Sequence, residues 1–373
     1  MMGPRTTAPE LPQSGAQVRA ELRCANTRHS RRNSDHQLRR MNRRSEHRFL
    51  KTLCHRFFWL FLTLPINGIV FGQTEDALPT PRLLSPVDTP PVFVRNTKDL
   101  SQWPNMIKAG INEARAHFGN YGPVFVYIAG HQNSELNSKA FHRRLTAEYC
   151  RHRHPSNEDE FNACLKGSAS EIIKKAMSGR GDAYLSMVQD TDPPIAELVF
   201  INPHEFHAPY LYTRGIHEYT HVFQRSFPRT PTWMMEGGAE FYASYLGDKR
   251  GWANFRHDMI HYLQNVKRIP DPALGIRDME DIDKASPEIR KYYRHLAYDA
   301  GAWAFAFMIH QSKSQRVSDV TKSLYPQIAK RGWEAAFADH VNMKDKGVFY
   351  EKFTALLQQP LDQQLEMLNA IKD

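Results

Sequence analysis

The sequence predicts an α+β fold, with strands confined to its first part and helices dominating its second. Two stretches rich in β-branched and aromatic residues, 123–128 and 195–201, indicate strands. From Tyr210 onward, apolar residues recur at helical spacing almost to the end of the chain. Residues 73–373 have the length of one large domain or two close subdomains.

The residues before this part are different in character. Residues 1–40 are rich in Arg, Ser and Gln, which predicts a disordered basic arm or a segment upstream of a true start at Met41. Residues 41–72 join a basic stretch to an apolar run, as in a secretory signal peptide. We expect a secreted or periplasmic protein that contacts the membrane only through this signal; anchoring by an uncleaved signal is the alternative. Residues 73–97 are Pro-rich and predict a linker.

The distribution of charge also separates the N-terminal segment from the rest. Residues 1–56 contain thirteen Arg or Lys and four acidic residues, which accounts for the whole formal excess of +9. The remaining residues, with 36 basic and 36 acidic side chains, are neutral. Because they contain no basic stripe with interleaved aromatic residues, we expect no nucleic-acid partner.

Two cysteines remain once the signal segment is set aside. Cys24 and Cys54 lie in or before the signal, so Cys150 and Cys164 are the pair that the exported chain would keep. An even pair in an exported protein predicts one disulfide bond, and two reduced thiols are the alternative.

The sequence His217-Glu218-Tyr219-Thr220-His221 matches the pattern H-E-x-x-H. The surrounding stretch 210–227 predicts a helix with one buried face. Residues four apart lie on the same face of a helix, so both imidazoles can reach one metal ion. Glu218 lies about 100° further round, beside the metal. A general base at that place can take a proton from a zinc-bound water.

A catalytic zinc ion needs three protein ligands and one open position. The stretch 232–243 follows two prolines and predicts a second helix, with Glu236 near its start. Glu240 lies four residues later and therefore on the same face. Either carboxylate is a candidate for the third ligand.

H-E-x-x-H followed by a helix with the pattern W-x-x-E-G-x-A-E resembles the gluzincins of the peptidase-MA-like superfamily. The resemblance implies that Glu236 is the third ligand of one zinc ion per chain. It also implies that Glu240 hydrogen-bonds a ligand histidine, which would fix its tautomer and orientation. Arg214 occupies a position where these enzymes often carry a small or β-branched residue.

The resemblance further implies a zincin-like architecture. A mixed α/β subdomain with an edge strand, residues 98–209, would precede a mostly helical subdomain, residues 210–373, that contains the zinc helix. The strand 195–201 stands just ahead of this helix, where gluzincins have an edge strand that binds extended substrate by strand addition. Tyr298-Asp299-Ala300-Gly301 looks like the Y-x-x-G segment of the family. Tyr298 would then donate a hydrogen bond to the oxyanion, and simple core packing is the alternative.

Together these features predict a zinc-dependent metallopeptidase that hydrolyses peptides or proteins, with Glu218 as general base. Two other functions stay open. The first is a non-peptidase zinc hydrolase on the same scaffold, and the second is a non-catalytic binding protein with a zincin fold. The intact Glu218 argues against the second, since a protein that only holds zinc has no use for a base beside the metal.

Overall fold

A computed structural model describes residues 82–373 of the chain. The predicted basic arm (1–40), the predicted signal peptide (41–72) and the first part of the predicted linker lie outside the described residues. Within residues 82–373 the fold is α+β, with strands near the beginning and helices throughout the second half, as the sequence predicts.

The main sheet has four strands in the order β2 (Val92–Val94), β4 (Val124–Ala129), β6 (Ile195–Ile201) and β5 (Asp182–Val188). The first three run parallel, and β5 runs antiparallel to β6. The strand β6 therefore lies inside the sheet, and the expectation that residues 195–201 form the edge strand is wrong. All but the first of its residues are buried, as on a strand covered on both faces, whereas β5 is mostly half-buried and forms the edge.

Two short strands lie within the segment that we expected to be a linker. One is β2, at the other edge of the main sheet. The other, β1 (Ser85–Pro86), pairs antiparallel with β3 (Tyr121–Gly122). The described part of residues 73–97 is thus tied to the folded part of the chain by strand pairing.

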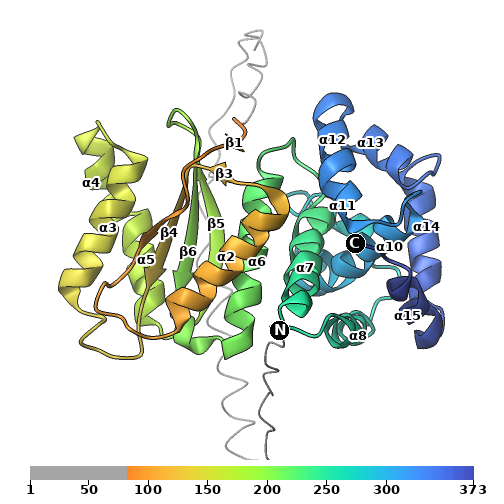
Figure 1. The fold of residues 1–373 in the computed structure, drawn as a ribbon, viewed down its shortest axis with the longest axis horizontal. Coiled ribbons are helices and arrows are strands. Elements are labelled where there is room, and N and C mark those ends of the chain that lie inside the picture. Colours follow the sequence, from red (N-terminus) through yellow and green to blue (C-terminus); the bar gives the residue numbers. More distant parts are fainter. Residues whose placement is uncertain (1–81) are drawn as a thin grey trace, which may run out of the picture. The chain divides into compact units, whose positions relative to one another are not determined.

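Helices cover both faces of the main sheet (Figure 1). Side chains alternate along a strand, so Val126 and Leu198 face one helical layer and Tyr127 and Val199 face the other. The first layer consists of α2 (Trp103–Phe118) and α6 (Ala208–Gln224), and the second of α3 (Lys139–Arg153), α4 (Glu158–Lys166) and α5 (Ser168–Met177). In the second layer a disulfide bond joins Cys150 of α3 to Cys164 of α4, which confirms the predicted pairing.

The second half of the chain is helical and shares one continuous core with the α2–α6 face of the sheet. The predicted helices are present, and the predicted boundary at residue 210 runs through this core. The elements are α7 (Thr232–Lys249), α8 (Phe255–Val266), α9 (Pro287–Arg290), α10 (Gly301–Gln311), α11 (Val317–Asp319), α12 (Tyr325–Arg331), α13 (Trp333–His340), α14 (Lys346–Leu357) and α15 (Leu361–Asn369). The remaining helical segments are two single turns and two π-helical segments. The turns are η1 (Pro203–Glu205) and η2 (Ile276–Met279), and the π-helical segments are η3 (Arg294–Ala300) and η4 (Val320–Leu324). Within residues 82–373, no helix combines the length and the apolar character needed to cross a membrane.

The helices α7 and α10 meet through their backbones. A Cβ atom added to Gly237 would lie 2.1 Å from the carbonyl carbon of Gly301. A Cβ atom added to Gly301 would lie 2.7 Å from the carbonyl oxygen of Trp233. Only glycine fits at such a crossing. The start of α7 is thereby held against the segment η3, which runs directly into α10.

Candidate metal centre

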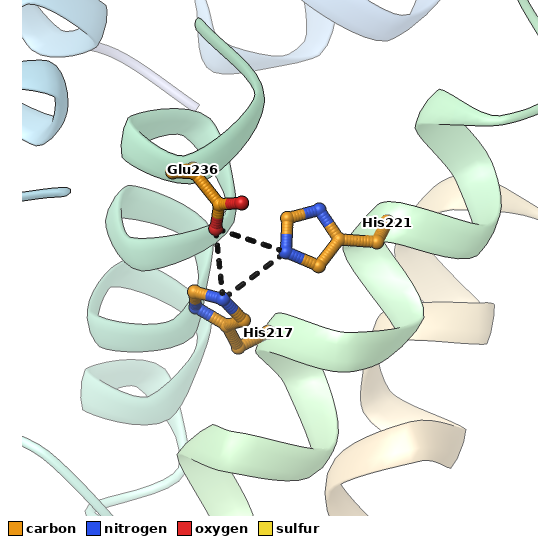
Figure 2. A group of neighbouring side chains, drawn as sticks. All are labelled: His217, His221 and Glu236. Carbon is orange, nitrogen blue, oxygen red and sulfur yellow. Dashed lines mark hydrogen bonds and ion pairs between the residues drawn. The ribbon is translucent and has the colours of Figure 1, made fainter. Parts of the chain in front are cut away.

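The helix α6 carries both histidines of the H-E-x-x-H sequence toward one point. Pro209 stands in its first turn, where a missing N–H costs nothing, and the helix ends at Gln224. Both imidazoles are buried, and their Nε2 atoms lie 3.2 Å apart (Figure 2). The predicted helix and the predicted pairing of these side chains are both present.

The helix α7 brings Glu236 to the same point. Its Oε2 atom lies 3.3 Å from Nε2 of His221 and 3.7 Å from Nε2 of His217 (Figure 2). Among residues 82–373, this buried Oε2 has no hydrogen-bond partner. Ligand atoms at about 2.0–2.1 Å from a tetrahedral zinc ion lie roughly 3.3 Å from one another. The three atoms are therefore close enough together for one metal ion to contact all of them.

The second ring nitrogen of each histidine lies near a side-chain oxygen. Gln224 donates from Nε2 to the carbonyl oxygen of Met235 at 2.9 Å, so its Oε1 is the atom 2.8 Å from Nδ1 of His221. Nδ1 of His221 must then donate. Nδ1 of His217 lies 2.9 Å from Oε2 of Glu240. A neutral His221 with its proton on Nδ1 would present the lone pair of Nε2 to a bound cation.

The ionisation of Glu236 and the protonation of the histidines depend on one another. Burial opposes ionisation of Glu236, but the two histidines outweigh it and hold the pKa of this carboxyl well below its usual value. Burial likewise opposes protonation of His221, yet the nearby Glu236 raises the pKa of the imidazole. A carboxylate that stays ionised among imidazoles is suited to bind a divalent cation.

Glu240 is buried behind His217, away from the triad of ligand atoms. Its Oε1 accepts a hydrogen bond from Arg294 of η3 at 2.6 Å. Although burial acts to raise the pKa of Glu240, Arg294 and His217 together hold it far below the usual value. Glu236, and not Glu240, therefore groups with the two histidines in a cluster that could hold a metal ion.

A small cleft of about 160 Å³ opens onto the ligand atoms. His217, His221, Glu236, Glu218 and Tyr298 all line it, together with residues 183–185 of the edge strand β5. Glu218 is 2% exposed and lies 3.4 Å through Oε1 from Nη1 of Arg214. The residues predicted for metal binding, proton transfer and oxyanion stabilisation therefore share one cavity.

Tyr298 of η3 lines this cleft, and Tyr293, the residue before η3, contacts Glu236. The ring of Tyr298 stacks on His217, with centroids 5.8 Å apart and planes 6° from parallel. Burial raises the pKa of its hydroxyl, so Tyr298 stays a hydrogen-bond donor at neutral pH. Tyr293 donates a hydrogen bond to Oε1 of Glu236 at 3.0 Å.

Three residues that support the site were not predicted from the sequence: Gln224, Tyr293 and Arg294. Gln224 follows His221 by three residues on one helix, and this spacing could have identified it. Tyr293 and Arg294 are more than fifty residues from the carboxylates that they contact, and no local pattern marks them. The predicted cysteine pair lies on the other face of the sheet and takes no part in the site.

Comparison of the chain with protein-family models, with curated proteins and with solved structures gave no match.

Proposed function

We propose that this protein is an exported zinc metallopeptidase of the gluzincin type, with a zincin-like fold. The observation that carries the proposal is the spacing of Nε2 of His217, Nε2 of His221 and the unpartnered Oε2 of Glu236. Two imidazoles and one carboxylate are the ligand set of catalytic zinc in several metallopeptidases. Imidazole ligands also favour zinc over magnesium or calcium.

A bound zinc ion would supply a Lewis acid and lower the pKa of water to roughly 7. Glu218 would take the proton from the attacking water and transfer it to the leaving amine. Tyr298, held as a neutral donor on the wall of the cleft, would hydrogen-bond the oxyanion. His217 and His221 would keep their orientation through Glu240 and Gln224.

The edge strand β5 supports a peptide as substrate. It pairs with β6 on one side and lies at the end of the strand order of the main sheet. Its residues 183–185 line the cleft beside the ligand atoms. An extended peptide could pair with the free side of β5 and place one of its carbonyl groups at the metal. This feature favours a peptidase over a hydrolase of small esters or amides, and Glu218 in the cleft favours catalysis over simple binding.

The test is the zinc content of the purified full chain, measured by mass spectrometry for the parent, Glu218→Gln and His221→Ala. We expect about one zinc per chain in the first two and none in His221→Ala, since Glu218 is not a ligand. The matched control His257→Ala removes an exposed histidine on α8 and should keep the metal.

Cleavage of peptide libraries, compared with that of esters and small amides, then separates the candidate activities. The parent should cut peptides and Glu218→Gln should not. Folded parent protein that holds no zinc after loading with the metal would contradict the proposal. A parent protein that binds zinc but cleaves no substrate would support the alternative of a non-catalytic binding protein.

A further inference from the structure

We propose that Arg214 is a substrate-recognition residue that binds a carboxylate of the peptide, next to the bond that is cut. This inference rests on the proposed function and adds to it a substrate class, peptides with an acidic side chain or a free C-terminal carboxylate at that place.

The position of Arg214 is the first observation. Arg214 and His217 line both the cleft at the ligand atoms and a second cavity beside it. The second cavity, called here the Arg214 chamber, has a volume of about 330 Å³, within the usual range for ligand pockets. Its walls come from α6, α7, α8 and η3 and from the loop between α7 and α8, with Tyr210, Thr213, Ser244 and Tyr262 among the lining residues. A group bound by Arg214 is therefore adjacent to the reacting atoms.

The second observation is that the guanidinium of Arg214 is largely buried but only partly hydrogen-bonded. The side chain is 14% exposed. Nη2 donates to the hydroxyl of Tyr210, and Nη1 lies 3.4 Å from Oε1 of Glu218, a long contact for an ion pair. Nε is buried, and among the described residues it has no hydrogen-bond partner. A buried N–H donor without an acceptor costs free energy, so its presence on a cavity wall indicates an acceptor from outside the chain.

The charges around the chamber select the kind of acceptor. Arg294 is already paired with Glu240 at 2.6 Å, and Asp258 accepts a hydrogen bond from Ser244 at 2.6 Å. Arg214 acts on Glu240 through its charge, but among the described residues its one ion pair is the long contact with Glu218, which the proposed reaction requires for proton transfer. A guanidinium presents N–H groups in a planar fork that matches the two oxygens of a carboxylate. A backbone carbonyl would satisfy one N–H but would not match the two-pronged fork.

Binding of small probes tests the inference without any need for catalysis. The probes are N-acetyl-glutamate amide, its glutamine twin, and N-acetyl-alanine with a free carboxylate, added to the full metal-free chain and followed by saturation-transfer NMR. We expect the carboxylate probes to bind at least about tenfold more tightly than the glutamine twin. Arg214→Met should abolish this difference, and Arg214→Lys should keep only part of it, because lysine lacks the fork. The control Arg250→Met, at a surface pair with Glu113, should change nothing.

Cleavage then identifies the source of the carboxylate. Peptide pairs that differ only in Glu against Gln, or in a free against an amidated C-terminus, are cut by the zinc-loaded parent and by Arg214→Lys. A preference for one member of either pair, weakened about tenfold or more by the substitution, supports the inference.

Equal binding of charged and neutral probes, or an equal loss of cleavage for all peptides in the Arg214 variants, overturns it. Arg214 would then only position Glu218. Carboxylate binding that depends on Arg214, without cleavage of any peptide, would uphold the site and contradict the proposed peptidase function alone.

Discussion

The hydroxyl of Tyr293 donates a hydrogen bond to Oε1 of Glu236 at 3.0 Å, while Oε2 of the same carboxylate faces the two histidines. One oxygen is thus held by the protein and the other is left for a metal ion. Tyr293 therefore orients the carboxylate that we propose as the third ligand.

Tyr293→Phe should therefore weaken zinc binding about tenfold or more, since hydrogen bonds to metal ligands typically have effects of this size. Titration against a competing chelator measures the affinity. The matched control is Tyr292→Phe, the same change one residue away. Equal zinc affinities of parent and Tyr293→Phe would show that Glu236 is oriented by other contacts.

Tyr298→Phe separates catalysis from metal binding. If Tyr298 donates to the oxyanion, its loss should lower kcat for peptide cleavage by about 10²–10³-fold, with the zinc content unchanged. Steady-state kinetics on one cleaved peptide and metal analysis of the same sample measure both. An unchanged kcat would mean that Tyr298 serves only in packing, through the contact of its ring with His217, which is the alternative that the sequence left open.

Arg294→Met should destabilise the metal-free protein by about 1–3 kcal/mol, because it leaves the buried carboxylate of Glu240 without its cation. Urea unfolding measures the loss. The further change Glu240→Gln should restore part of the stability by removing the unpaired charge. Arg250→Met, at a surface pair, should cost less than about 1 kcal/mol. A cost for Arg294→Met as small as this would mean that solvent satisfies Glu240.

Removal of the disulfide bond should lower the free energy of unfolding by about 3 kcal/mol, given a sequence separation of 14 residues. Both cysteines are buried, so the test variant is Cys150→Ala with Cys164→Ala. Zinc content should be unaffected, because the bond lies on the other face of the sheet. Unfolding curves of the parent with and without reductant provide a second measurement. Coinciding curves would contradict the prediction.

Acid should destabilise the protein in part through His117. Burial lowers the pKa of this histidine from 6.5 to about 4. Between these two pH values the unfolded chain binds a proton that the folded chain does not, so stability falls as the pH falls through this window. The loss from pH 7 to pH 4 should be roughly 2–3 kcal/mol for this residue. His117→Phe should reduce the pH dependence by that amount. The exposed His257→Phe should not, and equal slopes for both variants would refute the assignment.

Local spacing was enough to predict the centre of the site. His217, Glu218 and His221 lie within five residues of one helix, and the helix period alone places the two imidazoles together. Glu236 was harder, since Glu240 lies on the same face of α7. The choice depended on the family resemblance. In the structure the two carboxylates have separate tasks, because Arg294 and Nδ1 of His217 engage Glu240.

The contacts that sequence reasoning could not supply are those between distant segments. The strand 195–201 was predicted with its observed bounds, yet its neighbours in the sheet were not, and β5 proved to be the edge. β5 has the mixed composition of a half-buried strand, and no alternating pattern marked it. Tyr293 and Arg294 likewise become part of the site only when η3 packs against α7.

The crossing of Gly237 and Gly301 has a consequence for how the site tolerates change. Side chains at a helix contact absorb small errors by changing rotamer, but two backbones in contact have no such freedom. The separation between the helix with the third ligand and the segment with Tyr298 is therefore a fixed dimension of the protein. One methyl group at either glycine would therefore change the distance between the proposed ligand Glu236 and the proposed hydrogen-bond donor Tyr298.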